Sequence, residues 1–159
     1  MAFVRIISED HFQADTFRNG ESWSIIVNVG YDDGTDAKYS LVVGLSPMIG
    51  GPNEFFFHIV EVDGQNGEEY LYWSAKDVAS FIPSEDRVVI LGALLKATRV
   101  LLENAQPSRV EMVSYDPNPP EKALVKYFMV GKMFESCGYT VNVADAYHGK
   151  RVWWMERSD

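Results

Sequence analysis

The stretch of residues 109–157, RVEMVSYDPNPPEKALVKYFMVGKMFESCGYTVNVADAYHGKRVWWMER, carries the pattern that decides the fold. Pro119 and Pro120 indicate a helix start, because proline costs least in the first turn of a helix. Gly138 indicates the helix end, where a left-handed backbone favours glycine. The stretch therefore predicts a strand, a helix and a closing pair of strands, at residues 109–115, 119–137, 139–143 and 150–155.

A longer helix is expected in front of this stretch, at roughly residues 85–104. Ser84 is a suitable N-cap residue, and Glu85 and Asp86 suit the positive end of the helix dipole. Apolar residues leave this helix little polar face, which predicts that most of it is buried.

The first half of the chain has the composition of an antiparallel meander. Segments rich in β-branched and aromatic residues alternate with Asp-Gly turn signals, which tolerate positive φ. Ser8, Glu9 and Asp10 also indicate the start of a brief helix that would end near Gly20. Strands are expected at residues 3–7, 22–30, 38–45, 55–62 and 69–74, with a short helix at 75–81. Either of the last two strands would directly precede the first long helix.

Length and composition favour one compact domain covering residues 1–159. Hydrophobic residues make up 47% of the chain, enough for a sizeable core. Cys137 is the only cysteine, which excludes an intrachain disulfide and a cysteine-rich metal site. No segment approaches the roughly 20 apolar residues of a membrane span, and the first apolar stretch is too short for a signal peptide. We therefore expect a cytoplasmic protein without a metal ion.

The formal net charge of −9 bears on the choice of partners. Non-specific binding to nucleic acid or to an anionic membrane needs a basic surface, so neither is an expected partner. The acidic excess permits a basic partner, although solubility explains the acidity equally well.

The order of these elements resembles that of the GNAT acyltransferase superfamily. The local similarity is best at residues 127–139, YFMVGKMFESCGY, where the family often has Asn-x-x-Ala-x-x-Leu-Tyr-Glu-x-x-Gly-Phe. The last positions of this motif are filled here by Met133, Phe134, Glu135, Gly138 and Tyr139, with Tyr127 at the Asn position and Val130 at the Ala position.

The resemblance implies a GNAT-like α/β domain of the α+β type, with a mixed, mostly antiparallel sheet flanked by two long helices. It also implies an acyl-coenzyme A-dependent N-acyltransferase, with acetyl-CoA as the donor and a small-molecule or peptide amine as the acceptor. In this superfamily a Glu on the strand before the first long helix can be the general base, and Glu61 holds that position. An exposed carboxylate at a strand end is the alternative explanation of Glu61.

The superfamily's phosphate motif, Arg/Gln-x-x-Gly-x-Gly/Ala, lies at the start of the first long helix, where backbone amides cradle a diphosphate. Ser84, Arg87 and Gly92 are the candidates for this site, but the spacing is two residues too long. Glu85 and Asp86 also place negative charge where phosphates would lie, which should weaken binding.

A second departure concerns the general acid of the superfamily, usually a tyrosine. By alignment to Gly138 that position is Phe134, which has no proton to donate. The alternative function is therefore a non-catalytic GNAT-like module that binds a protein partner or forms a homodimer. Aromatic residues of the closing strands, including Tyr147, Trp153 or Trp154, would form the contact. The two tryptophans are adjacent in a strand and must face opposite sides.

Other candidate residues have simpler structural explanations. His58 is a candidate catalytic residue or ligand, but histidine is also common as a partly buried, hydrogen-bonded residue. His148 is expected in a solvated turn, and Cys137 is expected as a small buried residue. The acids of the segment 32–36 do not have the spacing of a calcium loop and are expected in a polar hairpin turn.

Overall fold

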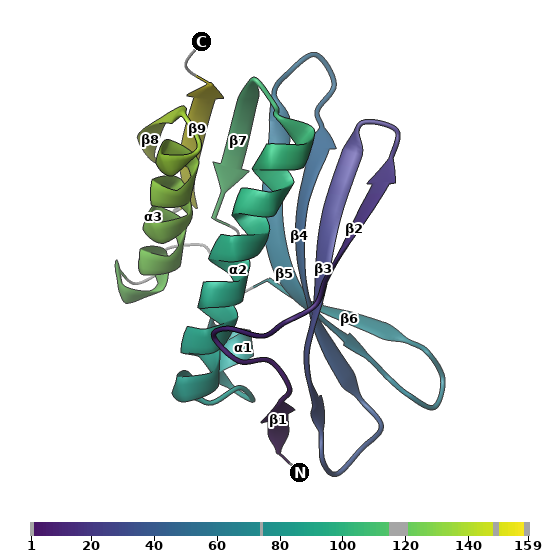
Figure 1. The fold of residues 1–159 in the computed structure, drawn as a ribbon. Coiled ribbons are helices and arrows are strands. Elements are labelled where there is room, and N and C mark those ends of the chain that lie inside the picture. Colours follow the sequence, from purple (N-terminus) through teal and green to yellow (C-terminus); the bar gives the residue numbers. More distant parts are fainter. Residues whose placement is uncertain (1, 74, 115–120, 148–149, 158–159) are drawn as a thin grey trace.

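The structure is a computed structural model that describes residues 2–73, 75–114, 121–147 and 150–157 (Figure 1). Its helices are α1 (Ala75–Ala79), α2 (Ser84–Ala105) and α3 (Glu121–Ser136). Its strands are β1 (Phe3–Arg5), β2 (Ala14–Asn19), β3 (Ser22–Asp32), β4 (Lys38–Pro47), β5 (Asn53–Val62), β6 (Glu69–Tyr72), β7 (Arg109–Val113), β8 (Tyr139–Tyr147) and β9 (Lys150–Arg157).

The nine strands belong to one sheet, whose main path runs β1-β3-β4-β5-β7-β9-β8. Beside this path, β2 pairs with β3 and β6 pairs with β5. β5 and β7 are parallel neighbours, and the other described pairs are antiparallel. The predicted α+β class with a mixed, mostly antiparallel sheet is therefore confirmed.

Local turn chemistry brings consecutive strands back beside one another. Between β3 and β4, the carboxylate of Asp32 accepts a hydrogen bond from the amide of Gly34 at 2.7 Å. After β5, the carboxylate of Asp63 accepts one from the amide of Gln65 at 2.8 Å, and Gly67 has a φ of 71°. Because these contacts satisfy turn amides locally, the chain reverses where the sequence predicted.

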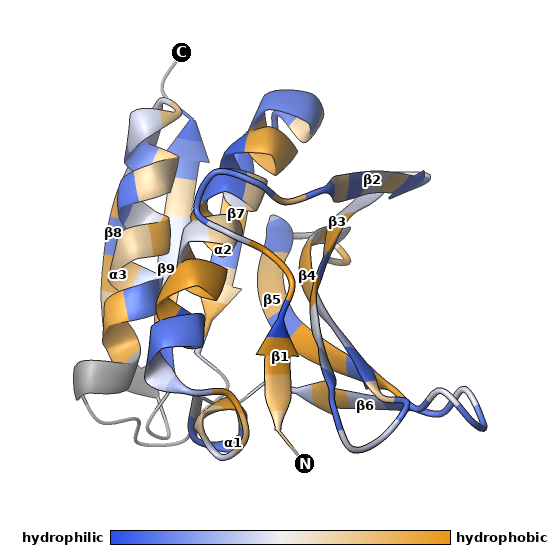
Figure 2. Cartoon of the chain, turned by 60° about the horizontal axis from the view of Figure 1, so that its bottom comes forward, coloured by the Kyte–Doolittle hydropathy of each residue, from blue (hydrophilic) through white to orange (hydrophobic). Residues whose placement is uncertain are grey.

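One face of the sheet builds the core together with α2 and α3, which both lie on that side (Figures 1 and 2). α2 packs over β3 and β4, whereas α3 packs over β8 and β9. Ile25 of β3 and Val43 of β4 are fully buried beneath α2. Burying such a side chain stabilises the fold by about 1.5–3 kcal/mol. We call this side of the sheet the core face and the opposite side the far face.

The long helix α2 buries one stripe and leaves its other side in solvent. Val88 is 65% exposed and Val100 is 37% exposed, so the prediction of a mostly buried helix is too strong. An apolar side chain outside the stripe stays in solvent when no other element packs against that side of the helix. The buried stripe consists of Ile90, Ala93, Leu94, Ala97, Thr98, Leu101 and Leu102.

The brief helix predicted from Ser8 to Gly20 is wrong. Most of its second half is the strand β2, which pairs with β3 from Ala14 opposite Val27 to Asn19 opposite Ser22. Gly20, with a φ of 64°, makes the hairpin turn. Pairing with β3 satisfies the backbone groups of this segment, and this overrides the local helix-start signal.

Gly30 allows β1 to lie against β3. A Cβ atom at this position would lie 2.4 Å from the Val4 carbonyl oxygen and 2.6 Å from the Phe3 ring. Because the first of these contacts is to backbone, Gly30→Ala should displace β1 and lower the unfolding free energy by about 1–3 kcal/mol. Thermal denaturation measures this change.

Gly92→Ala is the matched control, since a Cβ atom there meets nothing within 4 Å. Gly92 lies inside α2, where alanine is the better helix former, so this variant should be up to about 1 kcal/mol more stable. An equal loss of stability in both variants would contradict the role given to Gly30.

Candidate functional site

Glu61, the predicted general base, lies near the end of β5 and is held by a tyrosine. The hydroxyl of Tyr39 on β4 donates a hydrogen bond to Glu61 Oε1 at 2.7 Å. Burial, followed by the hydrogen bond to Glu61, raises the pKa of Tyr39 well above its ordinary value of 10.0. Burial and the charge of Glu61 likewise raise the pKa of Tyr72. Both phenols therefore keep their protons at neutral pH, and Tyr39 remains a donor to the carboxylate.

Aromatic contacts join the Tyr39–Glu61 pair to the segment just before α2. The ring of Phe81 stacks on Tyr39 at a centroid distance of 5.1 Å and packs on Tyr72 at 4.9 Å. Phe81 lies just before the first residue of α2, Ser84. The structure thus brings Glu61 and the predicted cofactor-binding segment into one neighbourhood through Phe81. Tyr39 and Tyr72 were missed in the sequence, because only the registers of β4 and β6 with β5 show that they share a side with Glu61.

The groups at the start of α2 are engaged within the protein. Arg5 Nε of β1 contacts Asp86 Oδ1 at 2.8 Å, and both side chains are partly buried. Arg87 Nη1 donates to the carbonyl of Ile82 at 2.8 Å. The amides of Asp86 and Arg87 donate to the carbonyl of Pro83 at 3.1 and 3.0 Å. A diphosphate at this position would have to displace an ion pair and a guanidinium–carbonyl contact.

The other two residues predicted to bind the cofactor are Ser84 and Gly92. Pro83, and not Ser84, is the N-cap residue of α2, with no side-chain hydrogen bond at the cap. The N-cap role predicted for Ser84 is therefore wrong, and Ser84 is the exposed first residue of the helix. Gly92 lies inside α2, away from its first turn.

The strand β5 changes its partner along one edge, and we call this place the β5 junction. Asn53, Glu54 and Phe55 pair with β7, whereas the stretch from Ile59 to Val62 pairs with β6. β4 pairs with β5 along its whole length and occupies the other edge. β6 is thus an extra strand that covers residues 59–62 of this edge, and residues 56–58 between the two stretches pair with neither strand among the described residues.

Aromatic rings fill the β5 junction on the core face. Phe57 of β5 lies 5.3 Å from the ring of Tyr127 of α3. Tyr127 in turn stacks on Trp153 of β9 at 5.0 Å with an interplanar angle of 12°. Trp153 is fully buried and Tyr127 is 3% exposed. These rings bridge β5 and β9 where the sheet opens.

Aromatic rings also cover the junction on the far face. His58 lies 4.2 Å from Trp73 and 5.9 Å from Phe56, measured between ring centroids. His58 Nδ1 is buried and has no hydrogen-bond partner among the described residues. Burial lowers the pKa of His58 below its ordinary value of 6.5, so the ring is neutral at pH 7.

The aromatic candidates of the last third of the chain fall into two groups. Phe134 is fully buried and packs edge-on against Phe55 at 5.3 Å, so this position is part of the core. Trp153 is also buried, whereas Trp154 is 44% exposed, which confirms that the two tryptophans face opposite sides. The side chain of Tyr147 and all of His148 lie outside the described residues.

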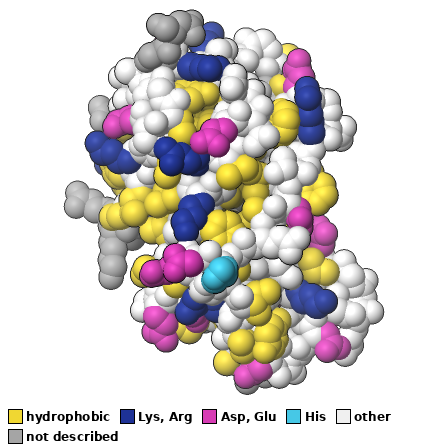
Figure 3. Space-filling model, in the orientation of Figure 1, with side chains coloured by type: hydrophobic (Ala, Val, Ile, Leu, Met, Phe, Trp, Pro, Cys, Tyr) yellow, Lys and Arg dark blue, Asp and Glu magenta, His cyan; other side chains and the backbone are white. Residues whose placement is uncertain are grey.

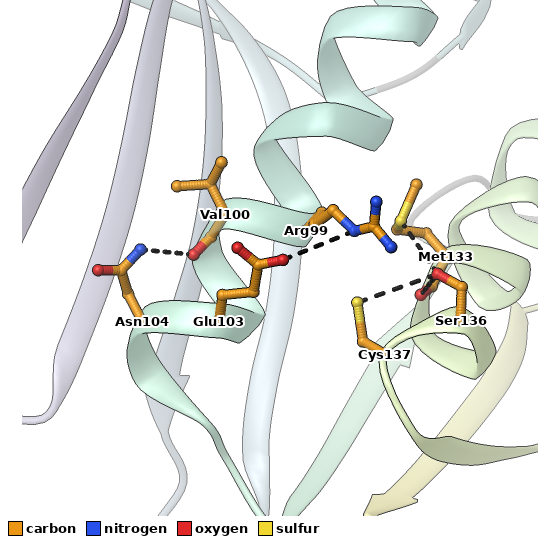
Figure 4. Close-up of polar contacts among 7 residues, drawn as sticks. All are labelled: Arg99, Val100, Glu103, Asn104, Met133, Ser136 and Cys137. Atoms are coloured by element: carbon orange, nitrogen blue, oxygen red, sulfur yellow. Dashed lines mark hydrogen bonds and ion pairs between the residues drawn. The ribbon is translucent and has the colours of Figure 1, made fainter.

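A cavity of about 270 Å³ lies where the C-terminal ends of α2 and α3 meet, away from Glu61. Figure 4 shows its neighbourhood, with Arg99 contacting Glu103 at 3.7 Å and the Ser136 hydroxyl donating to the Met133 carbonyl at 2.7 Å. Cys137 lines this cavity and is only partly buried. The residues around the cavity belong to helix ends and make polar contacts with one another. These contacts account for the polar residues there, so no ligand needs to be invoked.

Among the residues that the structure describes, no group of three or more His, Cys, Asp or Glu side chains is placed to hold a metal ion. None of the described helices has the length and apolar character needed to span a membrane. A scan against protein-family models and searches of curated proteins and of solved structures found no match to this chain.

Tyr39→Phe removes the donor that holds Glu61 and leaves the carboxylate in a partly buried site. A hydrogen bond to a charged group contributes about 1.5–3 kcal/mol, so the variant should lose that much stability in urea denaturation. Tyr70→Phe is the control, because Tyr70 donates to Glu68 on an exposed surface. Its stability should be nearly unchanged, as for most exposed substitutions. Equal losses of stability in the two variants would contradict a stabilising role specific to the Tyr39–Glu61 hydrogen bond.

The lowered pKa of His58 predicts a loss of stability in acid. Below about pH 6.5 the unfolded chain takes up a proton that the folded chain resists, so the unfolding free energy falls as pH falls. His58→Phe should flatten this part of the stability profile in denaturation series at stepped pH. His11→Gln, at an exposed histidine elsewhere in the chain, is the control substitution. An unchanged slope in His58→Phe would refute the prediction.

Proposed function

We propose that this chain is a GNAT-like domain that acts by binding another protein and does not use acyl-coenzyme A. The observation that carries the proposal is the β5 junction, whose edge is occupied by β6 at residues 59–62 and whose two faces carry aromatic rings. Ligands of sheets with parallel strands bind in an open crevice at the carboxyl ends of those strands. Here the carboxyl end of β5, residues 59–62, is paired with β6 of the same chain.

The GNAT-like part of the proposal is supported by the order of the elements. An antiparallel meander leads to α2, β7 runs parallel to β5, and α3 ends at Gly138 before the β8–β9 pair. Gly138 has a φ of 93°, the left-handed backbone expected after a helix end. A fold alone does not imply an activity, because function depends on the residues of a site.

Three of those residues favour a module without catalysis. The guanidinium of Arg87 donates to a backbone carbonyl, and the carboxylate of Asp86 lies at the helix start with Arg5 as its partner. Phe134, at the position of the usual general acid, is enclosed in the core. A donor thiolate would therefore receive no proton from that position.

Of the two tryptophans in the closing strands, Trp154 is the exposed one and would contact a protein partner or a second copy of the chain. It is 44% exposed on β9, and exposed tryptophans are frequent anchors at interfaces. The helix side of the molecule, in contrast, shows acidic and basic side chains interspersed among apolar ones (Figure 3). A cytoplasmic location accords with this function and remains a prediction.

Acetyl-CoA at about 1 mM should leave the melting temperature of the protein unchanged. A ligand present at about 100 times its Kd would stabilise the fold by about 2.7 kcal/mol by mass action. For a domain of this size, such a gain raises the melting temperature by roughly 5–10 °C. A salt of matched ionic strength is the control for screening of surface charges.

The acyltransferase is the second candidate, favoured by the position of Glu61 near the start of α2. In that case Glu61 would be the base, and Ser84, Arg87 and Gly92 would lie at the coenzyme. A thermal shift with acetyl-CoA that Arg87→Ala abolishes and the neighbouring Val88→Ala retains would overturn the binding module and favour the enzyme. Val88 is a suitable control because its side chain is 65% exposed.

A further inference from the structure

The outermost strand, β8, leaves one edge of the sheet unpaired. It is the last strand of the main path, and among the described residues no strand pairs with its outer edge. Its residues 139–144, YTVNVA, include no charged residue, no proline and no glycine. Natural edge strands are normally protected by charges, prolines or short length, because their free amides and carbonyls can pair with another chain. Along this stretch β8 has none of these protections.

The other edge strands are protected. β2 carries Asp15 and Arg18, β1 is only 3 residues long and β6 only 4. β8, with 9 residues, is the longest of these strands. The sheet therefore offers one long, uncharged edge for pairing, and it lies at the end that α3 covers (Figure 1).

Exposed apolar side chains adjoin this edge on the core face. Val143 of β8 is 41% exposed, and Val125 and Phe128 of α3 are 52% and 48% exposed. Phe128 packs edge-on against Trp153 at 6.0 Å, and Trp153 is the cross-strand neighbour of Val143. We call Val125, Phe128 and Val143 the edge patch. Apolar residues grouped in this way on a surface mark a contact with another molecule.

The edge patch and the free edge form one surface, because α3 runs antiparallel to β8. The ring of Phe134 contacts that of Tyr139 at 5.3 Å, where β8 begins. Further along β8, a Cβ atom at Gly131 would meet Val141 at 3.5 Å. One helical turn before Gly131 lies Phe128, and two residues after Val141 lies Val143, which brings the edge patch together beside the strand.

Charge does not oppose the approach of two copies at this edge. Residues 121–147, which span α3 and β8, contain three lysines and three acidic residues and so carry no net charge. Lys126 lies over an aromatic ring of its own chain. The acidic excess of −9 therefore belongs to other segments. Two ion pairs neutralise further charges nearby, Lys132 with Glu135 at 3.4 Å and Arg109 with Glu156 at 3.8 Å.

We propose that two copies of this chain associate through β8. The two β8 strands would pair antiparallel about a two-fold axis perpendicular to the sheet, so the sheet continues and both core faces lie on one side. Both α3 helices then flank the axis on that side, and their edge patches meet. An axis at Asn142, for example, would place Val141 opposite Val143 of the second copy. By symmetry, each copy supplies the strand and the apolar side chains that the other lacks.

Sedimentation equilibrium of the full chain tests the association. The mass should approach twice the 18.0 kDa of the chain as its concentration rises to about 100 μM, a range that detects even a weak dimer. The mass of a single chain at the highest concentration would overturn the proposal.

Lysine substitutions then locate the interface. Val143→Lys and Val125→Lys should each raise the dimer Kd at least about tenfold, because each places two cations in an apolar contact. Phe17→Lys on the β2 edge and Val88→Lys on α2 are the matched controls, since these side chains are 52% and 65% exposed. Both controls should leave the Kd unchanged.

Circular dichroism melting checks that each variant is folded. Val125→Lys, on the surface of a helix, tests the interface should Val143→Lys fail to fold. A dimer that both edge-patch variants leave intact, or that the controls weaken equally, would refute the assignment to β8.

This inference goes beyond the proposed function and does not depend on it, because β8 lies apart from Glu61 and from the start of α2. A thermal shift with acetyl-CoA that depends on Arg87 would overturn the binding module and leave the dimer untouched. A chain that sediments as a monomer would overturn the dimer and leave the acetyl-CoA result as it is.

Discussion

The edge of β5 is the constraint on which the rest of this structure depends. A strand inside a sheet must satisfy its backbone groups on both edges, because an unpaired buried amide or carbonyl is costly. β4 covers one edge of β5, but the parallel strand β7 covers only residues 53–55 of the other. β6 folds back over residues 59–62, and rings from α3 and β9 fill the space on the core face. Between these two stretches, residues 56–58 of this edge pair with neither β6 nor β7 among the described residues.

The two sides of the sheet differ in packing. The core face is covered by α2 and α3, and the polar groups at the start of α2 have partners within the protein, such as Asp86 with Arg5. The far face carries the rings of Phe56, His58 and Trp73, and the partly exposed Trp154.

Much of the architecture could be predicted from the sequence, because its signals are local. Asp-Gly turns, the prolines before α3 and Gly138 after it mark boundaries that depend only on backbone preferences of nearby residues. Alternation along a strand likewise placed Trp153 and Trp154 on opposite sides, without saying which one is buried. The strand position of Glu61 was predictable for the same reason. These properties need no knowledge of distant residues.

Tertiary structure alone decided the rest. The segment of β2 carries a helix-start signal before it, yet it is a strand because β3 supplies its partner. The ion pair between Arg5 and Asp86 and the hydrogen bond between Tyr39 and Glu61 join residues far apart in the chain. No local pattern shows them, since they depend on the register of strands and on the path of the chain between them. The same holds for β6, whose short sequence predicted a strand but not the edge that it covers.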